Sequence, residues 1–151
     1  MDEIFEIYII EETLRNITES FKKYAEKHSE AIGFLCGKVR KWKNKKYIII
    51  EEYITAENDS NATRARFSKP AFNKLSKKLK NKFIVGWAHS HPSYGSFLSN
   101  TDIQTHNDLF PEDYQVALVI DPLAEEENGV ETKFFKTTKN SYSEISYAVI
   151  K

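Results

Sequence analysis

The chain has 151 residues, 40% of them hydrophobic and 13% aromatic, which suffices for one core and is too little for two. Lysine plus arginine and aspartate plus glutamate number 22 each, so no net charge favours nucleic acid or an anionic membrane. One cysteine excludes an internal disulfide and any zinc site with two thiolates from this chain. An acidic N-terminus without a long apolar run predicts a single cytoplasmic domain over residues 1–151, with no membrane span.

The first third of the chain predicts a strand, a helix and a β-hairpin. Residues 4–10 are short and β-branched, which suits a strand. Apolar side chains then recur at helical spacing: Leu14, Ile17, Phe21 and Tyr24. Residues 31–39 and 45–54 are strand-like runs, and the polar residues 40–44 between them fit a hairpin connection.

The middle of the chain predicts an irregular segment, a helix and a central strand. Residues 55–68 are polar and irregular. Ser68 and Pro70 then offer an N-cap and an early-turn proline for a short helix. Residues 83–91 begin wholly apolar, as a central strand does, and end in a polar cluster, where open sheets commonly place ligands.

The rest of the sequence, residues 99–150, predicts one helix followed by strands. We expect a short helix over residues 99–110 and then a buried strand over 114–122, which Pro122 ends. An acidic surface loop should follow over 121–129, and two late strands over 130–136 and 143–150. Together with the earlier elements, these predict an α/β (α+β) fold in which a mixed sheet is flanked by about three helices.

Two histidines stand one residue apart at the end of the predicted central strand. Side chains at i and i+2 of a strand share a face, so His89 and His91 project together and can bind one metal ion, whereas Ser90 faces the other way. This pair alone is weak support for a metal, because hydrogen-bonded or surface histidines also occur at this spacing.

Asp102 offers a third ligand, because Pro92 turns the chain and the Gly95 loop can return the next helix to the strand end. Two imidazoles, one carboxylate and an open position make up a catalytic zinc site. The alternative reading of Ser99 and Asp102 is a helix capping box. The two readings are compatible, since a capped helix start would hold the aspartate rigid.

A hydrolytic metal site needs a base to accept a proton from the attacking water, and a nearby carboxylate is the usual choice. Glu30 is our candidate, because it stands immediately before the apolar strand at 31–39. From the residues alone, a solvated glutamate at a strand entry is the competing interpretation.

Two separated motifs carry a resemblance to a known family. They are EAIGFLCG at residues 30–37 and His-x-His at 89–91, the latter followed by seven residues, Ser99 and then Asp102. Together they resemble the JAMM (MPN+) metalloprotease signature. The stretch GWAHSHPSYGSFLSNTDIQTHN and the later VALVIDP are most similar to the proteasome-lid deubiquitinase and signalosome isopeptidase type. The resemblance covers residues 4–136.

The resemblance implies a curved sheet of MPN (cytidine-deaminase-like) architecture and one Zn²⁺ per chain, held by His89, His91 and Asp102. It also implies that Glu30 is general base and then proton donor to the leaving amine, and that Ser99 stabilises the tetrahedral oxyanion. Members of this family cleave isopeptide bonds between a lysine and the C-terminal glycine of ubiquitin or a ubiquitin-like modifier. The implied partners are therefore ubiquitin or ubiquitin-like protein conjugates.

Two further segments match substrate-facing parts of the family. Phe97 matches a bulky aromatic and could cover the substrate tail, or it could simply pack the loop onto the domain. Residues 55–68 lie where the family carries a substrate-facing insertion, although a merely tolerated loop is an equal alternative. The short sequence after residue 136 leaves little room for partner-binding segments, so we expect a monomer or homodimer.

The other reactive side chains receive no catalytic role. Cys36 lies in an apolar strand and is interpreted as a small core residue rather than a thiol nucleophile. His106 is one turn beyond Asp102, outside the motif, and we expect it at the surface or behind the ligands. His28 ends a charged helix and favours its dipole there.

Other classes of function fit less well. Amidohydrolases and the metallo-β-lactamase group need more histidines than the four present, and zinc deaminases need two neighbouring cysteines. The basic residues at 40–46 and the lysines of 74–82 are interpreted as a solvated face rather than a nucleic-acid site. A non-catalytic MPN scaffold or binding module in a larger complex stays as the alternative function, although the scaffold members of the family lose motif residues and this chain loses none.

Overall fold

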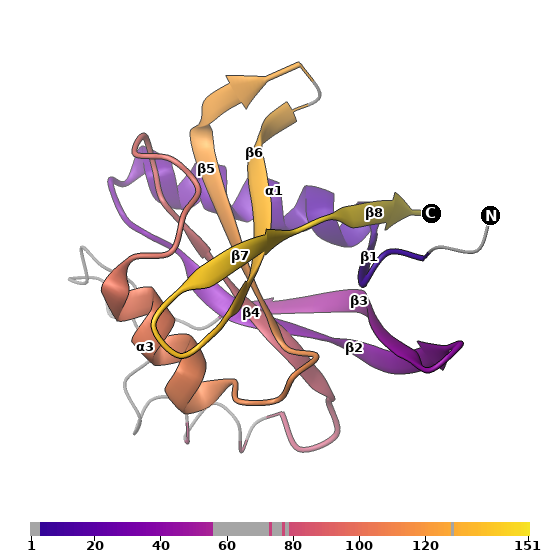
Figure 1. Ribbon diagram of the computed structural model, residues 1–151. Coiled ribbons are helices and arrows are strands. Elements are labelled where there is room, and N and C mark those ends of the chain that lie inside the picture. The colour runs from indigo at the N-terminus through magenta and orange to yellow at the C-terminus, as the bar shows by residue number, and fades with distance from the viewer. Residues whose placement is uncertain (1–3, 56–72, 74–76, 78, 128) are drawn as a thin grey trace.

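The computed structural model describes residues 4–55, 73, 77, 79–127 and 129–151. In this part of the chain, two helices accompany one eight-stranded mixed sheet, an α+β arrangement that confirms the predicted fold class (Figure 1). Most of the third predicted helix, beginning at Ser68, and nearly all of the irregular segment 55–68 lie outside the described residues. None of the described helices combines the length and apolar character needed to cross a membrane.

The sheet has the strand order β7-β6-β5-β4-β2-β3-β1-β8. In chain order the elements are β1 (Ile7–Ile10), α1 (Glu11–Glu26), β2 (Ile32–Trp42), β3 (Lys45–Thr55), β4 (Ile84–Ser90), α3 (Asn100–Leu109), β5 (Val116–Glu126), β6 (Gly129–Thr137), β7 (Tyr142–Ile145) and β8 (Tyr147–Ile150). β1 is parallel to β3 and β8, and β4 is parallel to β5, whereas the other neighbours are antiparallel.

The sheet curves until its two edges nearly meet. β7 and β8 stand at opposite ends of the strand order, yet only Ser146 separates them in the chain. One continuous stretch therefore pairs with β6 through its first half and with β1 through its second, and Figure 1 shows it as one band across the sheet.

The predicted hairpin is confirmed, and its turn is shorter than the five polar residues 40–44 that were predicted as the connection. β2 and β3 run up to Trp42 and Lys45, so only Lys43 and Asn44 make the turn. Both turn residues have positive φ, 49° and 68°, as the favoured two-residue hairpin turn requires. β2 therefore extends three residues, as far as Trp42, into the segment that was predicted as the connection, whereas β3 begins where it was predicted.

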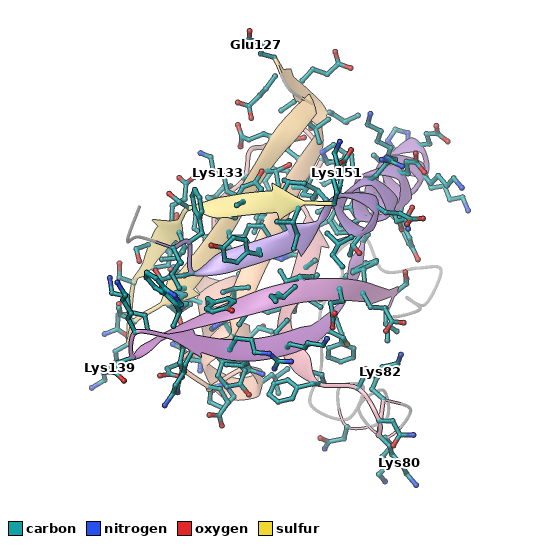
Figure 2. The ribbon with its side chains drawn as sticks, turned by 90° about the vertical axis from the view of Figure 1, so that its right-hand side faces the viewer. Lys80, Lys82, Glu127, Lys133, Lys139 and Lys151 are labelled. Atoms are coloured by element: carbon teal, nitrogen blue, oxygen red, sulfur yellow. The ribbon has the colours of Figure 1, made fainter. Side chains whose placement is uncertain are left out.

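Each face of the sheet carries its own core. The first core lies under α1 and contains mainly aliphatic side chains from the centre of the sheet, among them Ile9, Ile50 and Leu118, with Ile17 and Phe21 of the helix. The second lies under α3 and is richer in aromatics: Phe34, Trp87, Phe110 and Phe135 belong to it. Figure 2, turned by 90° from Figure 1, shows β8, β1, β3 and β2 side by side and Glu127 at the tip of the projecting β5–β6 hairpin.

Pro122 does not end β5, which corrects the prediction from the sequence. The strand continues to Glu126, and the acidic stretch predicted as a surface loop forms the outer part of the β5–β6 hairpin. The pairing shifts register between Asp121 and Glu125, and such a bulge is where a strand tolerates a proline that has no N–H to donate. β5 therefore runs past the end of β4, beside the loop that follows it.

Candidate metal centre

The two histidines of the central strand lie together on one face, as predicted. His89 and His91 stand at the end of β4, and each is 3% exposed. Ser90 faces the other way, where its Oγ accepts a hydrogen bond of 2.8 Å from the backbone N–H of Ala31. That bond ties the end of β4 to the start of β2.

Three potential ligand atoms converge at this end of β4. His89 Nε2 is 2.9 Å from His91 Nε2, and Asp102 Oδ2 lies 3.1 Å and 3.2 Å from those two atoms. Ligands about 2.0–2.1 Å from a tetrahedral ion stand about 3.3 Å apart, so the triangle is close to the size a metal would impose. These residues can therefore hold a metal ion, and sequence reasoning named all three.

The capping box and the ligand reading of Asp102 coexist. Ser99 is the N-cap of α3, its Oγ accepts a bond of 3.1 Å from the Asp102 N–H, and the Ser99 N–H donates to Asp102 Oδ2 at 3.0 Å. Burial raises the pKa of Asp102, but hydrogen bonds with His89 and His91 and the N–H of Ser99 outweigh it and hold that pKa well below its usual range. The carboxylate is therefore ionised and fixed at the helix start.

The outer nitrogens of the two rings are held differently. His91 Nδ1 lies 3.1 Å from the carbonyl oxygen of Gly95, and since a carbonyl only accepts, Nδ1 carries the proton and Nε2 offers a lone pair inward. His89 stacks on Trp87 at 4.5 Å and 7°, which fixes its ring plane. The buried His89 Nδ1 has no hydrogen-bond partner among the described residues.

The donor set fits a divalent cation. An ionised carboxylate oxygen and the lone pair of His91 Nε2 point at one spot, where they repel each other unless a proton or a cation lies between them. A metal ion supplies that charge for all three groups at once. The loop after β4 completes the arrangement, because the Gly95 carbonyl selects the ligating form of His91.

Glu30 lies beside this cluster. Ile32 pairs with His89 in the antiparallel β2–β4 ladder, so two residues further along Glu30 stands opposite His91 on the same face. The hydroxyl of Tyr94 donates to Glu30 Oε2, and the Tyr94 ring stacks on His91 at 4.6 Å and 18°. Tyr94 thus spans from His91, a candidate metal ligand, to Glu30, the carboxylate that was chosen from the sequence as the candidate base. Its position in the loop between the ligands was the signal available in the sequence.

Two aromatic side chains form the exposed rim of the cluster. Phe97 is 38% exposed and meets the His91 ring edge-on at 5.0 Å, while Tyr94 is 49% exposed and lies 6.1 Å from Phe97. Phe97 therefore packs against the site and faces solvent at once. Both readings given to it from the sequence, packing and substrate cover, are compatible with this position.

His106 is buried, so of the two positions expected for it, at the surface or behind the ligands, the structure agrees with the second. It is 3% exposed, and its Nδ1 accepts a hydrogen bond of 2.9 Å from the Trp87 indole N–H. Burial lowers the pKa of His106 to about 4, which keeps the ring neutral. His106 thus supports Trp87, which in turn stacks on His89. The signal was available, because Ile103, His106 and Phe110 fall on one helical face.

The remaining reactive groups agree with their predicted structural roles. Cys36 is 3% exposed, and burial together with the nearby Glu52 raises the pKa of its thiol to about 11, which opposes a nucleophilic role. His28 follows the end of α1 with a φ of 56°, and the N–H of Ser29 returns to the carbonyl of Tyr24. This is the Schellman type of helix end, so His28 terminates a helix and has no contact with the candidate site to suggest chemistry.

Comparisons with known proteins agree with this geometry. The family model described as JAB1/Mov34/MPN/PAD-1 ubiquitin protease matches residues 3–112, which contain the whole cluster. The chain is 32% identical over 123 residues to COP9 signalosome complex subunit 5 of Debaryomyces hansenii, covering 75% of this chain and 25% of that protein. It is 37% identical over 95 residues to subunit 5b of Arabidopsis thaliana, covering 61% and 25%.

A second kind of relative belongs to the proteasome. The 26S proteasome non-ATPase regulatory subunit 14 of Dictyostelium discoideum is 32% identical over 76 residues, covering 50% of this chain and 25% of that subunit. The chain spans about a quarter of the length of these curated relatives. A solution structure of a Desulfitobacterium hafniense protein superimposes with a TM-score of 0.68 at 19% identity, covering 96% of this chain and 93% of that one, which supports the fold alone. The chain therefore belongs to the JAB1/Mov34/MPN/PAD-1 family.

Proposed function

We propose that this protein is a zinc-dependent isopeptidase that hydrolyses the bond between the C-terminal glycine of ubiquitin or a ubiquitin-like modifier and a substrate lysine. The observation that carries the proposal is the convergence of His89 Nε2, His91 Nε2 and Asp102 Oδ2 within 3.2 Å of one another. Two imidazoles and one carboxylate leave the fourth tetrahedral position open, which is the composition of catalytic rather than structural zinc sites.

Zinc held by these three residues would supply Lewis-acid polarisation of the scissile carbonyl and a lowered pKa for the attacking water. The chain prepares the ligands for this. Asp102 is kept ionised by its hydrogen bonds, and the Gly95 carbonyl holds His91 in the form whose Nε2 is free of a proton. Less of the binding free energy is then spent on arranging the ligands.

Glu30 is proposed as the general base. A carboxylate opposite His91 can accept a proton from the attacking water and then deliver it to the departing lysine amine, so that amide and water become carboxylate and amine. The Tyr94 hydroxyl supports this role, because its hydrogen bond restricts the orientation of the Glu30 carboxylate.

Ser99 is proposed to stabilise the oxyanion. As N-cap, its Oγ uses a lone pair to accept the Asp102 N–H, and its hydroxyl proton is the donor that a developing negative charge would receive. A donor aimed in this way is worth about 3 kcal/mol of barrier. Phe97, at the exposed rim, is proposed to cover the substrate tail.

The substrate class rests on the relatives. The family model carries the description ubiquitin protease, and the matching curated proteins are subunits of the COP9 signalosome and the 26S proteasome. An extended, glycine-ended tail suits an open site at a strand end, where backbone hydrogen bonds and a few side-chain contacts can hold it. We further propose a cytoplasmic enzyme that acts as a monomer or homodimer.

The decisive experiment measures bound zinc and isopeptide cleavage in the same preparations. The substrate is a lysine-linked ubiquitin or ubiquitin-like conjugate, and the variants are Glu30→Gln, His89→Ala and the control Glu26→Gln, at the exposed end of α1. We expect Glu30→Gln to retain zinc and lose about 10²–10⁴-fold in kcat. His89→Ala should lose zinc, and Glu26→Gln should behave as wild type. Unchanged activity in Glu30→Gln would exclude the mechanism, and wild type that binds zinc but cleaves no conjugate would favour the scaffold alternative.

A further inference from the structure

Glu131, on β6, contacts the loop that follows the two histidines. Its carboxylate Oε1 accepts a hydrogen bond of 2.5 Å from the backbone N–H of Ser96, and its own carbonyl oxygen accepts one of 3.1 Å from Ser96 Oγ. Glu131 is partly buried and stands opposite Asp121 in the β5–β6 register. The sequence analysis predicted no role for Glu131.

The same peptide group contacts His91. The N–H of Ser96 and the carbonyl of Gly95 belong to one peptide bond, and that carbonyl is the group 3.1 Å from His91 Nδ1. A single planar peptide therefore separates the Glu131 carboxylate from the imidazole. We propose that Glu131 is a positioning residue that acts on His91 through the Gly95–Ser96 peptide and strengthens it as a metal ligand, an inference that rests on the proposed function.

The physical effect is polarisation along a hydrogen-bond chain. An anionic acceptor beside the N–H of a peptide polarises that peptide and shifts electron density away from the anion, onto the carbonyl oxygen. The oxygen then accepts more strongly from His91 Nδ1. The stronger that bond, the more firmly the proton stays on Nδ1 and the richer in electrons Nε2 becomes. Many metal-ligating histidines donate directly to a carboxylate for this purpose. Here one peptide group is interposed.

Asp121 holds the same loop from the neighbouring strand. Its carboxylate, 2% exposed, accepts from the N–H groups of Ser93 at 2.8 Å and Gly95 at 2.9 Å. Ser93 and Gly95 both have positive φ, 69° and 89°, a backbone path that costs about 1 kcal/mol or more for a residue with a side chain. The loop thus needs anchors to hold its shape, and Asp121 fixes the path while Glu131 acts on the peptide facing His91.

The test compares Glu131→Ala and Glu131→Gln with a matched control. Alanine removes the acceptor, glutamine keeps an acceptor oxygen without its charge, and Glu125→Gln removes one charge from an exposed position of the same hairpin. Imidazole ¹⁵N spectra of the metal-free proteins report which nitrogen of His91 carries the proton. Competition with a chromophoric chelator then gives the zinc affinity of each protein, and thermal melting verifies folding.

We expect His91 to be protonated on Nδ1 in wild type and in Glu125→Gln, and the Nε2-protonated form to become populated in Glu131→Ala. Zinc affinity should fall by about tenfold in Glu131→Ala and less in Glu131→Gln, in the range typical for groups that support a metal ligand. An unchanged His91 spectrum in folded Glu131→Ala, or unchanged zinc affinity, overturns the proposal. A wild type that binds no zinc refutes the proposed function instead, and the His91 spectrum still decides whether Glu131 sets the protonated nitrogen.

Discussion

The neutral state of His106 should make the fold sensitive to acid. The ring is 3% exposed, and its Nδ1 accepts a hydrogen bond of 2.9 Å from the Trp87 indole N–H. Its Nε2–H is then the group that hydrogen-bonds with the backbone of Gln115. A second proton can enter only at Nδ1, where it would face the indole N–H, donor against donor. Desolvation opposes the charge as well, so the pKa of His106 is about 4 in the folded protein.

The magnitude follows from the difference between folded and unfolded pKa values. An unfolded histidine titrates near 6.5, so between that pH and about 4 the unfolded state binds more protons than the folded state at His106. The free energy of unfolding therefore rises with pH across this window. Above pH 6.5 both states hold a neutral His106, so this residue causes no further rise. At pH 5 the free energy of unfolding is lower by about 2 kcal/mol, because of His106, than it is above pH 6.5. Well below pH 4 this loss reaches its full value of about 3 kcal/mol.

Urea titrations of wild type and His106→Gln at pH 7.5 and 5.0 test this reasoning. Glutamine can accept from the Trp87 indole with its oxygen and does not titrate, so the variant should lose about 2 kcal/mol less than wild type between the two pH values. Both proteins share the neighbouring charged groups Glu112, Asp113 and Lys136, so the difference isolates His106. A parallel ¹⁵N titration of wild type should show a neutral His106 ring down to about pH 5; protonation near pH 6.5 would refute the argument.

Three further changes probe the backbone and the cap. His28→Gly should raise the free energy of unfolding by about 1 kcal/mol in urea, since glycine favours the φ of 56° that follows α1; a destabilised variant would contradict this reading of the helix end. Gly37→Ala should cost about 3 kcal/mol or more, because its Cβ would lie 1.8 Å from the Ile49 carbonyl oxygen; a thermal midpoint equal to wild type would exclude that contact. Ser99→Ala should lose about 1 kcal/mol of stability as a cap and about 10²-fold in kcat; loss of stability alone would leave Ser99 a cap only.

Local periodicity was enough to predict the elements that hold the ligands. The two-residue period of a strand places His89 and His91 together, and the capping box anchors Asp102 at the helix start; both patterns operate within a few residues. The same two-residue period would also have predicted Trp87 on the face of His89, where it stacks. What the period could not supply is the distance across the loop from His91 to Asp102, which depends on tertiary anchors.

The errors arose where long-range pairing overrides a local signal. Pro122 is a strand breaker in isolation, yet β5 continues past it because the antiparallel partner β6 extends to the same end and a bulge absorbs the missing N–H. Glu131 gives no local hint at all, because its partner Ser96 lies 35 residues away. Contacts of this kind follow from strand order, which composition and periodicity do not determine.

The two halves of the candidate site are joined by a single strand register. Glu30 reaches His91 only because Ile32 pairs with His89, and a slip of one residue between β2 and β4 would turn Glu30 to the opposite face. β2 and β4 also approach their outer neighbours closely. A Cβ on Gly33 would lie 2.5 Å from the Ile54 carbonyl oxygen, and one on Gly86 would lie 2.2 Å from that of Val116, so larger residues would force β2 from β3 and β4 from β5. Gly33 and Gly86 therefore act on the geometry of the site without touching it: they set how closely the strands pack, and the strands bring the carboxylate to the histidines.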